Sequence, residues 1–264
     1  MAANKAQSNR RQKSATRTGK STAGGLRLKG KVAVVTGGSR GIGQAVARTL
    51  AAEGCTVVIT GRDRLTLEKS ASQISTPRSG GKIVPLVCDV RDPASVAALF
   101  ATVKQRFRRL DILVNNAGVS QRQLTVEETS LELWHEQIET NLTGTFLCTR
   151  AALPLMPRGA TIINNLSAAA KRVFPNFAAY TAAKQGAFGF TLSLREELIP
   201  RGIRVTAFMP GATDTDIWQQ VMPNAPREKM MDVDGLARAV LYAVLLPPTA
   251  NLSELLLEPA CGAV

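Results

Sequence analysis

From residue 30 onward, short runs of aliphatic and β-branched residues alternate with longer segments in which apolar side chains recur every three or four positions. This alternation is typical of βαβ units, in which a helix connects one strand to the next parallel strand. The expected strands cover residues 32–36, 56–60, 83–87, 112–115, 161–166, 204–209 and 255–257. Most are apolar along their whole length, as strands are when helices cover both faces of a sheet. The sequence therefore predicts a single-domain, doubly wound α/β fold with a seven-stranded parallel sheet over residues 30–264.

Helices are expected between these strands. One begins near Ile42 and ends before Gly54, a residue type that commonly closes helices. Asp92 and Pro93 provide a cap and a first-turn proline for another. The remaining helical patterns cover residues 131–156, 178–199 and 234–246. Nothing in this series indicates an internal repeat or a second domain.

Residues 212–232 interrupt the alternation. Pro223 and Pro226 limit any helix there, while Trp218 and several methionines supply apolar surface. We expect this segment to form a mobile lid over the substrate, with an ordinary surface insertion as the alternative.

The composition sets further limits on function. The chain has 264 residues, 45% of them hydrophobic, and lacks the run of roughly 18 apolar residues that a membrane span requires. We therefore expect a soluble, cytoplasmic protein. Cys55, Cys88, Cys148 and Cys261 form no Cys-x-x-Cys pair and are expected to be reduced, buried thiols. The only histidine, His135, leaves almost no material for a zinc site or a histidine-based triad.

The net charge of +13 comes mainly from the N-terminal segment. Eight basic residues precede Gly30 and the first acidic residue is Glu53, which leaves +5 for the rest of the chain. Residues 1–29 are rich in polar and basic side chains and are predicted to form a disordered tail. An inert extension, an organellar transit peptide and a polyanion-binding arm are three interpretations of this tail. A nucleic-acid partner would be confined to it, and none is expected for the domain.

A glycine-rich turn follows the first expected strand and opens the first helix, with the sequence Thr36-Gly37-Gly38-Ser39-Arg40-Gly41-Ile42-Gly43. Glycines let the backbone turn tightly and approach a pyrophosphate, whose charge is met by the N–H groups at the start of the helix. A tight turn without a ligand is the alternative. The order of strand, turn and helix favours a dinucleotide site.

The end of the second strand bears on which dinucleotide is bound. A site for NAD places a carboxylate there to accept the ribose 2′-hydroxyl, whereas this chain reads Thr60-Gly61-Arg62. Arg62, together with Arg40 in the glycine turn, offers two guanidinium groups to a 2′-phosphate. The sequence thus favours NADP(H). Solvated surface charges are the alternative for both arginines, and Asp63 is an acidic residue close by.

Tyr180 and Lys184 are four residues apart in an expected helix and therefore share one of its faces. An ammonium and a positive nicotinamide ring would lower the Tyr180 pKa from its usual value of about 10, so that the phenol could exchange a proton with a carbonyl oxygen. Ser167 ends a predicted strand at the sheet edge where ligands bind, and its hydroxyl could hold the same oxygen. For the Tyr and Lys pair alone, an ordinary helix surface is the alternative.

Lys171 and Arg172 come shortly after Ser167. They are either contacts for an acidic substrate or part of a solvated loop face.

Together these features resemble the Tyr-x-x-x-Lys branch of the short-chain dehydrogenase/reductase family, which includes the 3-oxoacyl-[acyl-carrier-protein] reductases. The resemblance covers nearly everything from Gly30 to the C-terminus. The motifs that carry it are the turn at 36–43, Asp89-Val90, Asn115-Asn116-Ala117-Gly118, Asn141, Ser167, Tyr180-x-x-x-Lys184, and Pro210-Gly211 followed by Thr215.

The resemblance implies a Rossmann-type fold and a set of site residues. The catalytic residues would be Asn141, Ser167, Tyr180 and Lys184. Asn141 would hold a water that links Lys184 to solvent, Lys184 would also bind the nicotinamide ribose, and Asp89 and Val90 would contact adenine. The cofactor-binding residues expected from the motifs and the resemblance are Gly37, Ser39, Arg40, Gly41, Ile42, Gly43, Arg62, Asp89, Val90, Asn116, Ala117, Gly118, Tyr180, Lys184, Pro210, Gly211, Thr213 and Thr215.

Two features depart from the family pattern. Asn165 and Leu166 precede Ser167 where relatives often carry another small hydroxyl residue. The C-terminus lacks the Val-Asp-Gly-Gly ending that is common among 3-oxoacyl-carrier-protein reductases. The substrate therefore stays open between a 3-oxoacyl thioester, a 3-hydroxy acid and a sugar alcohol.

The leading hypothesis is an NADP(H)-dependent oxidoreductase that acts on a carbonyl compound or a secondary alcohol, with Tyr180 as general acid/base. A catalytically idle NADP-binding scaffold or sensor is the alternative, although such a protein has no chemical reason to keep the four catalytic residues together. The resemblance also implies a homotetramer or homodimer packed through the two long helices.

Overall fold

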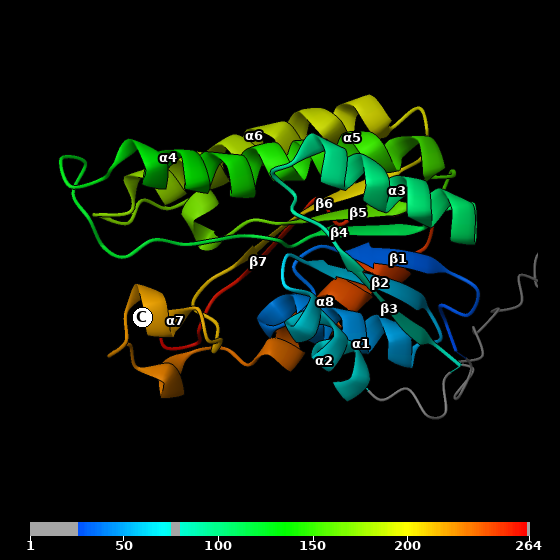
Figure 1. Ribbon diagram of the computed structural model, residues 1–264, viewed down its shortest axis with the longest axis horizontal. Coiled ribbons are helices and arrows are strands. Elements are labelled where there is room, and N and C mark those ends of the chain that lie inside the picture. The colour runs from blue at the N-terminus through cyan, green and yellow to red at the C-terminus, as the bar shows by residue number, and fades with distance from the viewer. Residues whose placement is uncertain (1–25, 75–79, 263–264) are drawn as a thin grey trace, which may run out of the picture.

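The computed structural model describes residues 26–74 and 80–262 (Figure 1). Most of the predicted basic tail, residues 1–25, lies outside the described residues. Within them, no helix is long and apolar enough to cross a membrane.

The described residues form one parallel sheet of seven strands in the order β3-β2-β1-β4-β5-β6-β7. The order reverses between β1 and β4, and a crevice for ligands is expected at the carboxyl ends of strands at such a point. The prediction of a doubly wound, seven-stranded parallel sheet is confirmed. The strands are β1 Val32–Val35, β2 Thr56–Gly61, β3 Lys82–Val87, β4 Ile112–Asn115, β5 Thr161–Asn165, β6 Arg204–Pro210 and β7 Glu254–Leu257.

Helices cover both faces of the sheet (Figure 1). One layer contains α1 Gly41–Ala52, α2 Arg64–Gln73 and α8 Val233–Leu245. The other contains α3 Pro93–Phe107, α4 Leu131–Ile138, α5 Gly144–Ala152 and α6 Ala178–Leu198. The α2 helix is absent from the expected elements because it buries only Leu67 and Ser70, too few positions for a clear helical period.

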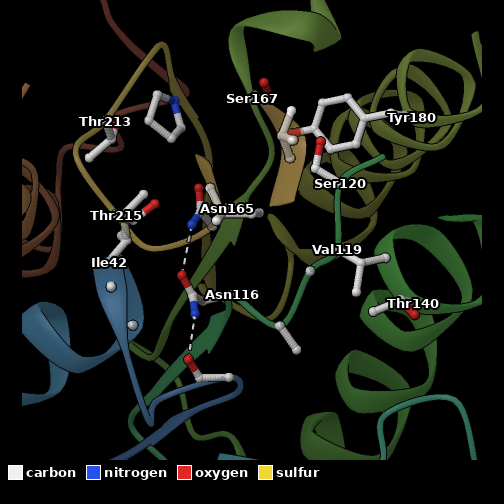
Figure 2. Close-up of a pocket in the computed structure, with 18 of the residues that line it drawn as sticks. Ile42, Asn116, Val119, Ser120, Thr140, Asn165, Ser167, Tyr180, Thr213 and Thr215 are labelled. Carbon is white, nitrogen blue, oxygen red and sulfur yellow. Dashed lines mark hydrogen bonds between the residues drawn. The ribbon is translucent and has the colours of Figure 1, made fainter. Parts of the chain in front are cut away.

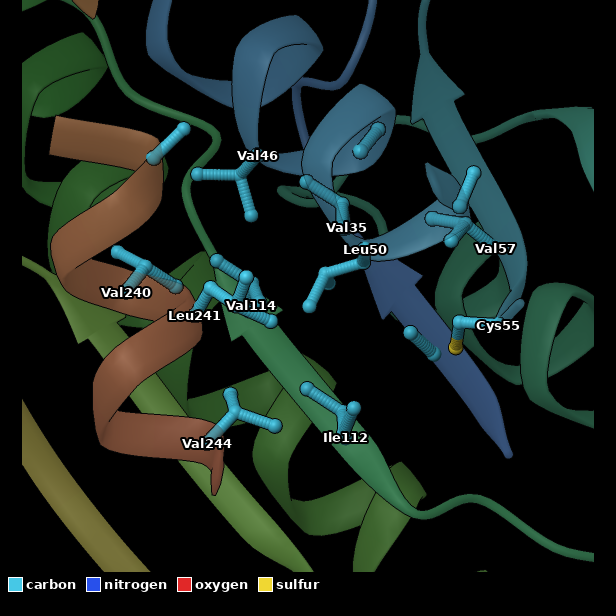
Figure 3. Close-up of a cluster of buried hydrophobic side chains, with 14 of the residues drawn as sticks. Val35, Val46, Leu50, Cys55, Val57, Ile112, Val114, Val240, Leu241 and Val244 are labelled. Carbon is cyan, nitrogen blue, oxygen red and sulfur yellow. The ribbon is translucent and has the colours of Figure 1, made fainter. Parts of the chain in front are cut away.

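Successive side chains of the central strands enter two separate cores. Ala33 and Val35 of β1 pack with α1 and α8, whereas Val32 and Val34 face α3, α5 and α6. Figure 3 shows the first core, where Leu50 of α1 lies between the sheet and Val240 of α8. Burial on both faces explains why these strands are apolar at every position.

Residues 131–155 are helical throughout, in agreement with the helical pattern expected over 131–156, but they do not form one regular α-helix. A π-helical turn, Glu139–Thr143, separates α4 from α5, and a 3₁₀ turn, Leu153–Leu155, follows α5. Single π turns are rare and are frequent at functional sites. The sequence did not predict this π turn, because the recurrence of apolar side chains is recognised only over many residues.

Buried asparagine side chains connect the strands just below the carboxyl edge of the sheet. Asn115 Nδ2 of β4 donates to Asn164 Oδ1 of β5 and to Thr149 Oγ1 of α5, both at 2.9 Å. Asn164 Nδ2 in turn donates to Thr191 Oγ1 of α6 at 2.9 Å. These bonds fix the two strands and the two helices that carry the site relative to one another.

Residues 212–232 lie beyond the carboxyl end of β6 and contain the short helix α7, Trp218–Val221, and a 3₁₀ turn, Arg227–Lys229. The indole Nε1 of Trp218 donates to the Thr213 carbonyl oxygen at 2.8 Å, and Thr213 forms a β-bridge with Met231. That this segment moves as a lid stays a prediction.

Three of the four cysteines are buried as expected. Cys261 is exposed, so the expectation of burial is wrong for this residue. Cys261 lies in the turn after β7, and no later helix or strand of the described chain packs over it.

Replacing Asn164 with Leu should destabilise the fold. Leucine has a similar branched shape and a larger volume, and it removes an acceptor for Asn115 Nδ2 and a donor to Thr191, in a position with no exposure to solvent. We expect the free energy of unfolding to fall by about 1–3 kcal/mol in chemical denaturation. Asn224→Leu, on the exposed segment after α7, is the control and should change it little. An equal loss in both variants would contradict the argument.

Candidate functional site

A cavity of about 620 Å³ opens at the carboxyl ends of the central strands. Sixteen of the predicted cofactor-binding residues, from Gly37 to Thr215, line it together with Ser167, Tyr180 and Lys184, although they come from seven separate stretches of the chain. Asn141 is the exception and lies behind the cavity wall. The structure thus brings the predicted cofactor turn and the predicted reacting groups into one space.

The glycine turn between β1 and α1 requires glycine for steric reasons. Gly37 and Gly41 have φ of +62° and +55°, the left-handed region that other residues rarely adopt. A Cβ on Gly43 would overlap Asn116 Nδ2 and the Gly37 carbonyl oxygen. No side chain caps α1, so the N–H groups of its first turn are left for an anionic ligand.

Arg40 and Arg62 lie at this end of the cavity, both exposed. Neither guanidinium has an ion-pair partner among the described residues. Asp63, the nearby acid, caps α2 by accepting from Thr66 N at 2.7 Å, and a hydrogen bond with Thr66 lowers its pKa. Because neither arginine is held in an ion pair within the described chain, both guanidinium groups can meet an anionic ligand at this end of the cavity.

Asp89 lies at the cavity as expected, but its carboxylate is held by a residue that the sequence did not single out. Arg91 donates to both carboxylate oxygens, at 3.0 Å from Nε and 2.6 Å from its terminal nitrogen. This hydrogen bonding lowers the Asp89 pKa, and Arg91 also lines the cavity. The only sequence signal for Arg91 is its position two residues after Asp89.

Asn116 and Asn165 connect the glycine turn to the end of β5, as Figure 2 shows. Asn116 Nδ2 donates to the carbonyl oxygens of Thr36 and Gly37 at 2.9 and 3.0 Å, and its Oδ1 accepts from Asn165 Nδ2 at 2.8 Å. Asn165 Oδ1 is buried without a hydrogen-bond partner in the described structure. In the sequence Asn165 was only a departure from the family pattern, yet it lines the cavity and links two of its walls.

Ser167, Tyr180 and Lys184 converge at the other end of this link. Ser167 lies two residues after the end of β5, and the Tyr180 ring extends toward it from α6 (Figure 2). Lys184 Nζ donates to the Asn165 carbonyl oxygen at 3.2 Å and lies 5.6 Å from the centre of the Tyr180 ring. A serine hydroxyl, a phenol and an ammonium at one sheet edge can bind and protonate an oxygen atom.

Burial shifts the pKa of both titratable groups. It lowers the Lys184 pKa to about 8 and raises the Tyr180 pKa above its usual value of 10, against the opposite effect of a hydrogen bond with Ser167. Without a cofactor, desolvation of the phenol dominates the Tyr180 pKa. That the Lys184 ammonium and a bound nicotinamide ring together lower the Tyr180 pKa stays a prediction.

Asn141 lies in the π-helical turn and binds the loop in front of it. Its Nδ2 donates to the Val119 carbonyl oxygen at 3.0 Å and to Gln137 Oε1 at 3.1 Å, and its Oδ1 accepts from Val119 N at 3.1 Å. A Cβ on Gly118 would lie 2.9 Å from Asn141 Oδ1 and 3.5 Å from Lys184 Nζ, so this glycine separates the two. A water between Asn141 and Lys184 stays a prediction. The fully buried Gln137 was not found from the sequence.

No group of three or more potential metal ligands occurs among the residues that the structure covers. His135 is exposed near the end of α4 and does not line the cavity.

Comparison with known proteins places these features in context. The family model described as short chain dehydrogenase matches residues 31–226, a range that includes every candidate site residue. A 3beta-hydroxysteroid dehydrogenase of Mediterraneibacter gnavus is 38% identical over 192 residues, which are 72% of this chain and 68% of that protein.

Solved structures share the fold of this chain over most of their own length. An alcohol dehydrogenase from the archaeon Thermococcus sibiricus, complexed with 5-hydroxy-NADP, is 32% identical, with a TM-score of 0.78 over 87% of this chain and 97% of its own. A short chain dehydrogenase from Burkholderia cenocepacia, in complex with NADP, is 31% identical, with a TM-score of 0.79 over 88% of this chain and 98% of its own.

Proposed function

Because this chain belongs to the short-chain dehydrogenase/reductase family of oxidoreductases, we propose that it uses NADP(H) to interconvert a carbonyl compound and a secondary alcohol. The observation that carries the proposal is the convergence of Ser167, Tyr180 and Lys184 in the same cavity as the glycine turn. Two relatives named as a hydroxysteroid dehydrogenase and an alcohol dehydrogenase support chemistry at a CH–OH group.

The cavity fits a dinucleotide with a 2′-phosphate. The uncapped start of α1 would hold the pyrophosphate, and Arg40 and Arg62 would hold the 2′-phosphate. Asp89 and Val90 would border the adenine, and Lys184 the nicotinamide ribose. The NADP and 5-hydroxy-NADP bound to two solved relatives support this cofactor. When bound, the nicotinamide supplies or accepts the hydride.

The remaining cofactor contacts would come from the loops around β4 and β6. Ala117 and Gly118 would border the nicotinamide side, next to Asn116. The segment Pro210, Gly211, Thr213 and Thr215 would contact the carboxamide and the phosphates. All of these residues line the cavity, and Asn165 Oδ1 adds a buried acceptor that still needs a donor.

Tyr180 would act as the general acid of the reduction. Its raised pKa keeps the phenol protonated near neutral pH, which is the form that donates a proton to a carbonyl oxygen. The hydroxyl of Ser167, toward which the phenol points, would hold the same oxygen. In the reverse direction the Lys184 ammonium would stabilise the phenolate.

Surface features support the assembly into a homodimer or homotetramer that we propose from the family resemblance. Phe146 of α5 is 41% exposed and packs edge to face on Phe190 of α6, with ring centres 6.0 Å apart. Exposed aromatic side chains are common in subunit interfaces.

Replacing Tyr180 with Phe removes the proton donor and leaves the ring in place. We expect kcat for carbonyl reduction to fall roughly 100- to 10,000-fold. The Kd of NADPH, measured by the change in its fluorescence, should stay within about twofold, because binding and proton transfer are separate functions. Full activity of the variant would overturn the proton-donor assignment. A wild-type protein that binds NADPH but reduces no carbonyl compound would favour the idle scaffold.

Arg40 and Arg62 predict a preference for NADPH over NADH in kcat/KM. Replacing Arg62 with Glu should reduce kcat/KM for NADPH by about tenfold or more and leave that for NADH nearly unchanged, because only NADPH carries the 2′-phosphate. Arg64→Glu is a matched control, because Arg64 is the first residue of α2, two residues after Arg62, and does not line the cavity. Equal kcat/KM for the two coenzymes in the wild-type protein would refute the preference.

The Lys184 pKa predicts how activity depends on pH. Lys184 is positively charged below a pH of about 8 and loses its charge as the pH rises through that value. If the charge binds the cofactor, kcat/KM for NADPH, which reports ionisations of the free protein, should fall on the alkaline side of about 8. Burial raises the Tyr180 pKa, so Tyr180 should not contribute to this limb. A profile that stays flat up to pH 10 would contradict the assignment.

A further inference from the structure

The cavity that contains Ser167 and Tyr180 is lined in part by large apolar side chains. Phe174 and Phe177 line it from the loop before α6, and Trp218, Val221 and Met222 line it from the segment that contains α7. These side chains belong to neither the glycine turn nor the strand ends. They therefore form the wall that a substrate would meet.

Every positively charged group that lines the cavity is either engaged or belongs to the cofactor end. Lys184 donates to the Asn165 carbonyl oxygen, and Arg91 is bound to Asp89. The two arginines without an ion-pair partner in the described chain, Arg40 and Arg62, lie at the glycine turn and the end of β2. Of the cavity-lining cations in the described structure, only Arg172 is left as a partner for an acidic substrate.

Arg172 is neutralised by Glu258, which also lines the cavity. Two parallel contacts join them, from NH1 to Oε1 at 2.8 Å and from NH2 to Oε2 at 3.0 Å. Such a paired geometry is the strong form of an arginine–carboxylate interaction. Neighbouring Lys171 forms its own ion pair with Glu254 of β7. Neither basic residue is free to receive an acidic substrate, and neither is merely solvated.

We propose that the substrate is a neutral, largely apolar ketone or its secondary alcohol, and that Glu258 determines this specificity by occupying Arg172. The inference rests on the proposed reductase function. A carboxylate that enters this space loses its hydration and finds no free cation in exchange, which is costly. An apolar group exchanges water for aromatic and aliphatic contacts, which is favourable. Of the open substrate classes, the charged 3-hydroxy acids fit least.

Three para-substituted acetophenones of similar size separate charge from polarity: 4′-isopropylacetophenone, 4-acetylbenzamide and 4-acetylbenzoate. With NADPH and the wild-type protein we expect kcat/KM to decrease in this order, with the carboxylate at least about tenfold below the amide. The amide matters because it is polar but uncharged. Equal or higher kcat/KM for the carboxylate would overturn the proposal.

Glu258→Gln tests the residue itself. Releasing Arg172 should raise kcat/KM for 4-acetylbenzoate by about tenfold and change that for 4′-isopropylacetophenone less than twofold. Glu254→Gln is the matched control, because it releases Lys171, which does not line the cavity. Adding Arg172→Met to Glu258→Gln should abolish the gain. No gain in a folded Glu258→Gln variant would remove Glu258 from the proposal.

The outcomes distinguish this inference from the function on which it rests. If NADPH reduces other carbonyl compounds but none of the neutral acetophenones, the substrate class is wrong and the reductase function stands. If NADPH reduces no carbonyl compound in a broad panel, the reductase function itself fails.

Discussion

Hydrogen bonds between asparagine side chains hold the carboxyl ends of β4 and β5 together, and the whole site depends on them. Asn115 and Asn164 pair inside the protein, and one residue further along each strand Asn116 and Asn165 pair at the cavity. The outer pair continues to the carbonyl oxygens of the glycine turn. A buried amide without a partner costs free energy, so these ladders specify one register of strands, turn and helices.

The same asparagine side chains link the glycine turn, where the cofactor phosphates would bind, to the part of the cavity that contains Tyr180 and Lys184. The backbone of Asn165 accepts from Lys184, while its side chain donates to Asn116 and so supports the glycine turn. Two residues, Asn116 and Asn165, thus link the turn that suits a phosphate to the ammonium next to Tyr180. Burial at this point lowers the Lys184 pKa and raises that of Tyr180, because the charged form of each group is poorly solvated.

Much of the fold could be predicted from the sequence. Five of the seven strands begin at the expected residue, and β3 and β7 begin one residue earlier. This agreement arises because apolar runs between turn residues reflect burial on both faces. The α2 helix and the π turn were not predicted. The α2 helix buries too few residues to give a helical period of apolar side chains. The π turn covers only five residues, Glu139–Thr143, which is too short a stretch to show in an apolar pattern.

By itself the sequence determined the order of elements, the glycine turn and the identity of the reacting groups, because these depend on local spacing and on chemistry that each residue type carries. Only the tertiary structure decided which charges are free. Arg172 and Glu258 are 86 positions apart and meet because the loops after β5 and β7 lie at the same edge of the sheet. Arg91 and Asn165 carry no motif, so their contacts could not be predicted either. Charge neutralisation depends on distance in space, which local sequence patterns do not contain.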